Sequence, residues 1–397
     1  MEFSTQKNSK KENIWVYAGD LIGMKTKSQQ KVINHNKPTI TQEEMNAVLE
    51  ALSNLELTIG TKVREFENTF SKYIGIRAIS LSSGTSALHL ALIALGISKN
   101  DEVILPSYTC ISVAFPVLYQ QAKPVLVDVN DDYNISIEDI KLKITDKTKA
   151  IIVPHMFGYP ADLKEIKELC REKSIYLVED CAQSIGALYH SKKVGRFGDV
   201  SIFSFYATKM MTTIQGGMVC TENSEWIEMI KDLRYHDQCR SSEDNDLRLK
   251  YSYMMSDVGA AIGIVQLRKL ENFINRRREI ANLYQSILNN NYIQHPVTNI
   301  EKNHVYSRYI IKSPYNPDKI IKELQKKGIE CARMYIPPLH KRAILKPFNI
   351  GVKFPKTDEI VSSTISIPIF PTLTDEEVLY IGRTLNNIMN EIKVKSV

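Results

Sequence analysis

The stretch Asp199-Val-Ser-Ile-Phe-Ser-Phe-Tyr-Ala-Thr-Lys209 decides how the rest of the sequence is interpreted. Its first half carries β-branched and aromatic residues with polar residues among them, which is typical of a strand. It then reaches small and hydroxylated residues and one lysine, and the pair Gly216-Gly217 follows. A lysine at the exit of an apolar strand either extends to solvent or is held for chemistry. The other motifs of the chain decide between these interpretations of Lys209.

The composition indicates a globular protein of more than one domain. The chain has 397 residues, of which 43% are hydrophobic and 24% charged. This length exceeds one ordinary core, so we expect two domains in one body. The net charge of +6 is small and scattered, so no nucleic-acid partner is predicted. The six cysteines show no metal-ligand spacing and lie mostly in apolar segments, which predicts reduced thiols and no metal site.

No segment has the pattern of a membrane span or an export signal. The longest uncharged run, Val103 to Ala122, contains two prolines and several polar residues. The amino terminus has lysines but neither an apolar segment nor a small-residue cleavage site. We therefore expect a cytoplasmic protein without a membrane partner.

The pattern along the chain predicts an α/β fold in three parts. Residues 1–37 read as an N-terminal arm, 38–275 as the large domain and 276–397 as a smaller α+β domain. In the large domain, short apolar strands alternate with helices, which indicates a sheet covered on both faces. A long helix is expected from Asp257 to about Leu288. The smaller domain is expected to hold strands at Tyr306–Ile311 and Ile329–Arg333, a helix at Asp318–Lys327 and a terminal helix from Asp375.

Two helices carry further expectations. Thr41 and Glu44 form a capping box, and Met45, Val48, Leu49 and Leu52 then give one apolar helical face. The run Arg276–Arg278 in the long helix is interpreted as a solvated face.

Four positions in addition to Lys209 resemble parts of a pyridoxal-phosphate site. Ser82–Thr85 follows a strand and opens a helix, where backbone amides and hydroxyls form a phosphate cradle, although such a segment is often only a turn. Asp180 ends a strand and could keep a pyridine nitrogen protonated, or could be a helix cap. Gln183 could donate to a ring oxygen, or be a surface amide. With Ser204 near the same phosphate, Lys209 is predicted to form the Schiff base.

Taken together, these motifs closely resemble the DegT/DnrJ/StrS family of sugar aminotransferases over about residues 38–390. The resemblance is carried by Lys37-Pro-Thr-Ile-Thr-Gln-Glu-Glu44, Leu81-Ser-Ser-Gly-Thr-Ser-Ala-Leu-His-Leu-Ala-Leu92, Asp101-Glu-Val-Ile-Leu-Pro-Ser-Tyr-Thr109, Pro124-Val-Leu-Val-Asp128, Glu179-Asp-Cys-Ala-Gln183, Gly198-Asp-Val, Ser204-Phe-Tyr-Ala-Thr-Lys209, Gly216-Gly217 and Pro338-Leu-His340. It implies the fold-type I architecture, with a seven-stranded, mostly parallel sheet and a small C-terminal domain. It also implies pyridoxal phosphate as cofactor and a homodimer whose subunits complete each other's active sites.

The resemblance assigns roles to matching positions. Lys209 matches the Schiff-base lysine, Asp180 the partner of the pyridine nitrogen and Gln183 the contact to the ring hydroxyl. The matching phosphate ligands are Gly84, Thr85 and Ser204, and the small-domain residue near the sugar is His340. Arg333 is a further candidate for a substrate carboxylate or phosphate, with a surface role as the alternative.

Some positions depart from the family pattern. Cys110 stands where many relatives have an aromatic residue that stacks on the cofactor ring, and Tyr108 could compensate near the substrate. Tyr251-Ser-Tyr-Met254 replaces the Tyr-Asn-x-Arg of many relatives, and Gly259 replaces a usual glutamine. Ser252 could still hydrogen-bond to the phosphate, whereas Met254 removes a cation.

The predicted reaction is transfer of an amino group from L-glutamate, or glutamine, to a keto sugar that is nucleotide-linked. An unactivated keto sugar, a sugar phosphate or a keto-cyclitol is the alternative substrate. Sugar dehydration is disfavoured because that subgroup has histidine in place of the lysine. The alternative from another class is a catalytically idle regulatory protein of this family.

Overall fold

The computed structural model describes residues 32–55, 57–236 and 248–394 of the chain. Most of the predicted N-terminal arm, and Cys239, lie outside the described residues. Ile33 pairs through a single bridge with Ile329, and Ile33 is buried. None of the described helices is both long and apolar enough to cross a membrane.

A seven-stranded sheet forms the centre of the larger part, with strand order β1-β9-β8-β5-β4-β2-β3. The pairs from β8 through β5, β4 and β2 to β3 are parallel, and β9 runs antiparallel to both β1 and β8. The predicted mostly parallel, seven-stranded sheet is therefore confirmed. The strands are β1 (Arg77–Leu81), β2 (Glu102–Pro106), β3 (Lys123–Val127), β4 (Thr148–Pro154), β5 (Tyr176–Asp180), β8 (Val200–Ser204) and β9 (Gly217–Thr221).

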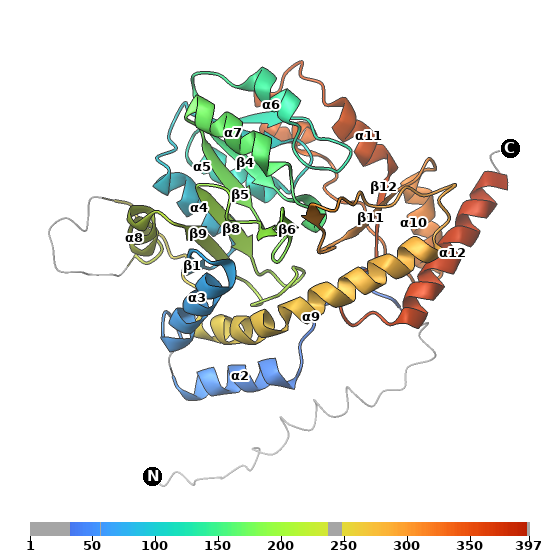
Figure 1. The fold of residues 1–397 in the computed structure, drawn as a ribbon, viewed down its shortest axis with the longest axis horizontal. Helices are drawn as coiled ribbons and strands as arrows, with labels where there is room; N and C mark the ends of the chain where they lie inside the picture. The colour runs from blue at the N-terminus through green and yellow to red at the C-terminus, as the bar shows by residue number, and fades with distance from the viewer. Residues whose placement is uncertain (1–31, 56, 237–247, 395–397) are drawn as a thin grey trace, which may run out of the picture. The chain divides into compact units, whose positions relative to one another are not determined.

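Helices cover both faces of this sheet because its strands are apolar at successive positions. In β2, Val103 and Leu105 enter the core beside α4, α5 and α8, whereas Ile104 enters the core beside α3, α6, α7 and α9. The helices are α3 (Thr61–Ile74), α4 (Gly84–Ala94), α5 (Phe115–Tyr119), α6 (Ile137–Lys143), α7 (Leu163–Lys173), α8 (Ser224–Leu233) and α9 (Asp257–Ile287). The long helix α9 starts beside α3 and extends to α12 (Figure 1).

The C-terminal part has its own small sheet and core. Antiparallel β11 and β12 pack with α10, α12 and the second half of α9. The predicted boundary near residue 275 lies inside α9 and stays a prediction. The predicted strand at Ile329–Arg333 is wrong, because this segment makes only isolated bridges. The elements are β11 (Tyr309–Lys312), α10 (Pro317–Lys326), α11 (Pro355–Ser363), β12 (Thr364–Ile367) and α12 (Asp375–Val394).

Short elements connect the two parts of the chain. β6 (Leu188–Tyr189) pairs with β7 (Lys192–Lys193) and with β10 (Lys302–Asn303). Single 3₁₀ turns are η1 (Ile111–Val113), η2 (Met156–Gly158) and η4 (Leu339–Lys341), and a longer one is η5 (Ala343–Phe348).

Helix α2 (Gln42–Ser53) turns its apolar face to the outside. The Thr41 capping box is present, as predicted, and Glu44 is buried. Met45 is 51% exposed, Leu49 61% and Leu52 46%. The predicted apolar face therefore does not enter the core of the described chain.

The interpretation of Arg276–Arg278 as a solvated face is wrong for its middle residue. Arg277 is 2% exposed, and its guanidinium donates to the carbonyls of Tyr306 and Ile369 at 3.2 and 2.9 Å. Consecutive helical residues point about 100° apart, so one of three adjacent arginines can be buried while the others are not.

Candidate active site

Lys209 lies in the loop that joins β8 to β9. Two backbone hydrogen bonds close this loop, from Phe205 N to Gly216 O (2.8 Å) and from Thr213 N to Phe205 O (3.0 Å). The lysine is half-buried, and burial lowers its pKa, opposed by the nearby Asp180 and Cys110 and assisted by Arg308. A lowered pKa increases the fraction of neutral amine, which is the nucleophilic form.

Asp180 lies at the carboxyl end of β5, which is the neighbour of β8. Its Oδ1 accepts a hydrogen bond from Ala182 N at 2.9 Å. Burial raises the pKa of this carboxyl, and the Ala182 amide, Lys209 and His155 oppose that rise. A positively charged ring nitrogen placed beside it would hold the carboxylate ionised. The structure thus brings Asp180 and Lys209 within electrostatic reach of each other, as the sequence predicted.

The turn before α4 contacts the ends of β8 and β9 so closely that only glycine fits. A Cβ on Gly84 would lie 2.8 Å from Ser204 Cβ, and a Cβ on Gly217 would lie 2.2 Å from Ser83 O. Ser83 caps α4, with its Oγ accepting from Ser86 N at 3.0 Å. The predicted phosphate ligands Gly84 and Ser204 are therefore adjacent, and Thr85 lies in the first turn of α4. Amides at a helix amino terminus beside hydroxyl groups fit a phosphate.

Gln183 is a buried amide, so the interpretation as a surface amide is wrong. Its side chain is 9% exposed, and its Oε1 accepts from Phe157 N at 3.3 Å. Its Nε2 lies 3.9 Å from Met156 Sδ.

Cys110 and Tyr108 differ in how much of each side chain is exposed. Cys110 is a half-buried free thiol whose Sγ lies 3.0 Å from Ser112 Oγ. Tyr108 is fully buried, with edge-to-face contacts to Phe157 and Tyr335. In this arrangement Tyr108 presents no exposed surface to a substrate.

The remaining predicted site residues are His340, Arg333 and Ser252. His340 is held by Ser107 Oγ, 2.6 Å from its Nδ1, and burial lowers its pKa against the effect of Asp358. Arg333 pairs with Asp318 at 2.8 Å and donates to a backbone carbonyl, so its charge is already matched. Ser252 is exposed, beside Tyr253, whose carbonyl accepts from Ser82 N at 2.8 Å.

A buried pair beside Asp180 supports the site. His155 Nε2 lies 3.2 Å from Glu179 Oε2, and its Nδ1 accepts from Ala161 N at 3.1 Å. Glu179 also accepts from the amides of Gly195, Phe197 and Gly198 at 2.8, 2.6 and 2.7 Å. His155 is therefore a structural hydrogen-bonder. Although Cys181 lies near both side chains, the Glu179 oxygens are occupied by these donors.

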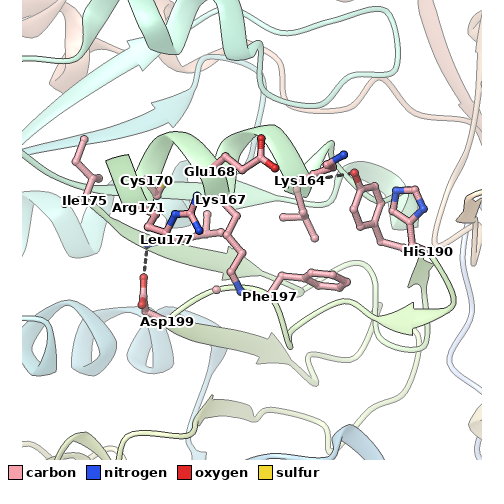
Figure 2. A pocket seen from close by; sticks show the side chains of 13 residues that line it. Lys164, Lys167, Glu168, Cys170, Arg171, Ile175, Leu177, His190, Phe197 and Asp199 are labelled. Atoms are coloured by element: carbon pink, nitrogen blue, oxygen red, sulfur yellow. Dashed lines mark hydrogen bonds between the residues drawn. The ribbon is translucent and has the colours of Figure 1, made fainter. Parts of the chain in front are cut away.

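A sizeable cavity lies away from Lys209. It measures about 550 Å³, and α7 and the segment around Phe197 line it. Figure 2 shows Lys164, Lys167 and Arg171 on α7 facing this cavity. Because none of the predicted site residues lines it, size alone does not locate the active site.

Comparison with known proteins identifies the family to which these motifs belong. The sequence profile of the DegT/DnrJ/EryC1/StrS aminotransferase family matches residues 38–386. The chain belongs to this family. It is therefore an enzyme, an aminotransferase. Members of the family depend on pyridoxal phosphate, which confirms the predicted cofactor.

Three relatives show how far the likeness extends along this aminotransferase. An uncharacterized protein of Methanocaldococcus jannaschii is 39% identical over 381 residues, covering 89% of this chain and 97% of that protein. A GDP-perosamine synthase of Escherichia coli O157:H7 is 33% identical over 91% of this chain and 100% of its own length. The crystal structure of the aminotransferase TlmJ from Streptoalloteichus hindustanus superposes with a TM-score of 0.86 at 30% identity, covering 91% of this chain and 100% of that chain.

Sequence reasoning missed three residues around the site, two beside the Lys209 loop and one near Asp180 and Cys110. Arg308 donates from Nη1 to Thr208 O at 3.3 Å, and Asn36 Nδ2 donates to the same carbonyl at 2.8 Å. Tyr335 stacks on Phe157 with ring centroids 5.9 Å apart. Arg308 directly precedes the apolar strand β11, and a charged residue in that place was the signal available in the sequence.

Proposed function

We propose that this aminotransferase moves the amino group of L-glutamate to a keto sugar, and that the sugar is linked to a nucleotide. The observation that carries the proposal is the convergence of Lys209 and Asp180 at the carboxyl ends of neighbouring strands β8 and β5. The relative of E. coli, a GDP-perosamine synthase, supports a nucleotide-linked sugar.

The residues of the chain have separable tasks in this reaction. Bound pyridoxal phosphate supplies an aldehyde carbon that exchanges amines and a ring that withdraws electrons. Gly84, Thr85 and Ser204 would hold its phosphate, Gln183 its ring hydroxyl, and Asp180 would keep a proton on its ring nitrogen. Lys209 Nζ, made less basic by burial, accepts the proton from Cα of the amino donor. In the second half of the cycle the same nitrogen returns a proton to the carbon that receives the amine.

His340 and Ser252 are proposed at the edges of the site. Ser107 fixes the imidazole of His340 at 2.6 Å and so orients it at the edge of the sheet where β2 ends. Ser252 is exposed in the single chain, which suits a contact with a partner subunit's phosphate.

A homodimer is part of the proposal, with α2 at its interface. Met45, Leu49 and Leu52 share one exposed apolar face of α2, and Leu55 and Leu57 just after the helix are also exposed. Contiguous apolar side chains on a soluble protein mark contact surfaces. A second copy of this chain is the occupant that we propose.

The test is a panel of acceptors offered to the pyridoxamine-phosphate form of the protein. Return of the visible absorbance with a nucleotide-linked keto sugar, together with an aminated product, is the expected result. Return only with unlinked keto sugars, sugar phosphates or keto-cyclitols would overturn the nucleotide-linked substrate. Unlinked acceptors belong in the panel because Cys110 and Met254 depart from the family pattern.

Two other outcomes would redirect the proposal. Release of ammonia without an amino sugar would indicate dehydration. A purified protein that takes up no pyridoxal phosphate would favour a regulatory protein without catalysis.

A further inference from the structure

The cavity beside α7 has the size and the lining of a small-molecule site. Its volume of about 550 Å³ falls within the range of roughly 300–1,000 Å³ that ligand pockets occupy. Its floor consists of buried apolar side chains from α7, from β5 and from the residue before β5, namely Leu163, Cys170, Ile175 and Leu177. Lys209 and the proposed cofactor residues are not among its lining residues, so a ligand here would be additional to the cofactor and the keto sugar.

Two aromatic rings form one side of the cavity, and backbone hydrogen bonds hold that side in place. Tyr189 and Phe197 both line the cavity and meet edge to face, with ring centroids 5.5 Å apart. The amide of Phe197 donates to the buried carboxylate of Glu179 at 2.6 Å. Leu177 N donates to Asp199 Oδ2 at 2.8 Å. The cavity is therefore formed without a ligand, as most small-molecule sites are.

Three cationic side chains of α7 lie at the mouth of the cavity. Lys164, Lys167 and Arg171 are exposed, and their i, i+3, i+7 spacing puts them on one face of the helix. Figure 2 shows Lys167 extending toward Phe197, whereas Glu168 extends in the opposite direction. In the part of the chain that the structure describes, none of the three cations forms an ion pair, whereas lysines of α6, α8 and α10 pair with carboxylates of their own helices.

The charges around the cavity favour an anionic ligand. The three cations of α7 face two carboxylates, Glu168 and Asp199, and the Leu177 amide already donates to one oxygen of Asp199. Lys192 adds a further positive charge, because its Nζ lies 4.9 Å from the centroid of the Phe197 ring. Lysine and arginine side chains suit a phosphate or sulfonate group, and the apolar floor suits an apolar body.

We propose that this cavity is a second binding site, separate from the active site, for a small aromatic molecule that carries a phosphate or sulfonate group. The aromatic body lies on the apolar floor against Tyr189 and Phe197. The anionic group meets Lys167 and Arg171 at the mouth, where water and both side chains can solvate it. Neither half alone accounts for the lining, because the floor offers no charge and the mouth offers little apolar surface.

The test is calorimetry on the full chain loaded with pyridoxal phosphate, so that the cofactor occupies the phosphate cradle of the active site. The probes are 1-naphthyl phosphate, 1-naphthol and inorganic phosphate. One molecule of 1-naphthyl phosphate is expected to bind per chain. The other two probes each carry half of the recognised chemistry and should bind at least about tenfold more weakly. Added salt should weaken the binding of 1-naphthyl phosphate and leave that of 1-naphthol unchanged.

Two variants of α7 locate the bound probe. The double variant Lys167→Gln with Arg171→Gln removes two exposed charges at the mouth and should weaken 1-naphthyl phosphate roughly 10- to 150-fold. Lys173→Gln is the matched control, because Lys173 is exposed in the last turn of the same helix and does not line the cavity. This control should bind 1-naphthyl phosphate as the wild type does.

Two results would overturn the proposal. The first is that 1-naphthyl phosphate does not bind to the wild type, which includes the case in which a partner subunit covers the cavity. The second is equal affinity for 1-naphthyl phosphate in the wild type and the double variant, because the probe would then bind elsewhere. Neither measurement involves an amino donor or a keto sugar, so this site and the proposed function can fail separately.

Discussion

Substitution of Gly217 by alanine tests the close contact between β9 and the turn before α4. The added Cβ would lie 2.2 Å from Ser83 O and 2.7 Å from Gly84 N. The first distance is roughly 1 Å shorter than a weak C–H···O contact. Both neighbours are backbone atoms of the turn, so the strand and the phosphate cradle must move apart.

The expected losses of folding stability and of cofactor affinity follow from two free-energy costs. Overpacking of this kind destabilises a fold by about 1–3 kcal/mol. If the shift also breaks one hydrogen bond to the cofactor phosphate, a further 1.5–3 kcal/mol of binding energy is lost, which weakens cofactor affinity by roughly 10- to 150-fold. Gly217→Ala should therefore unfold at lower temperature and bind pyridoxal phosphate more weakly than the wild type.

Gly259→Ala is the matched control for this substitution. Its Cβ would lie 3.3 Å from Thr213 O, and Gly259 lies in the first turn of α9. Alanine there gains helix propensity of about 1 kcal/mol against this mild contact, so stability should stay close to that of the wild type. Thermal unfolding of the cofactor-free proteins and a pyridoxal-phosphate titration measure both effects. Wild-type stability and cofactor affinity in Gly217→Ala would refute the reasoning.

Three further predictions concern other parts of the chain. Asp180→Asn should lower kcat roughly 10²- to 10⁴-fold while the cofactor still binds; wild-type kcat would show that the ring nitrogen has another partner. Burial raises the pKa of Glu44, but hydrogen bonds from Thr41, Gln266 and Lys269 outweigh it and lower the pKa to about 2. This carboxylate therefore stabilises the fold above its ordinary pKa, and that stability is lost as pH falls from about 4.5 to about 2, by up to about 3 kcal/mol. Urea unfolding should show a flatter acid limb for Glu44→Gln than for exposed Glu43→Gln, and equal limbs would contradict the assignment. Leu49→Glu should convert a dimer into a monomer in light scattering, whereas Leu142→Glu, on α6 and even more exposed, should not; a dimeric Leu49→Glu would remove α2 from the interface.

The sheet could be predicted because its signals are local. Short apolar strands separated by helices admit few arrangements other than a parallel sheet covered on both faces. The carboxyl ends of neighbouring parallel strands meet at one edge, so Asp180 and Lys209 were expected to approach each other, and they do. The start of α9 at Asp257 could also be predicted, since Ser256 caps it.

Burial of single side chains could not be predicted where it depends on distant segments. The periodicity of α2 shows that Met45, Leu49 and Leu52 share a face, but does not show that this face lies outside. Arg277 is buried because Tyr306 and Ile369 pack on α9 from far along the chain. Arg308 was missed for the same reason, because its proximity to Lys209 comes from the contact of the residue just before β11 with the loop after β8.

The most direct test of the account is the absorbance and activity of Lys209→Ala, with Lys209→Arg as the variant that keeps the charge. Both proteins should bind pyridoxal phosphate through the Ser82–Thr85 cradle, yet neither should show the visible band of the lysine-bound cofactor. Neither should transfer an amino group from L-glutamate to a keto sugar at a measurable rate. Wild-type absorbance or activity in Lys209→Ala would contradict the central claim that this lysine carries the chemistry.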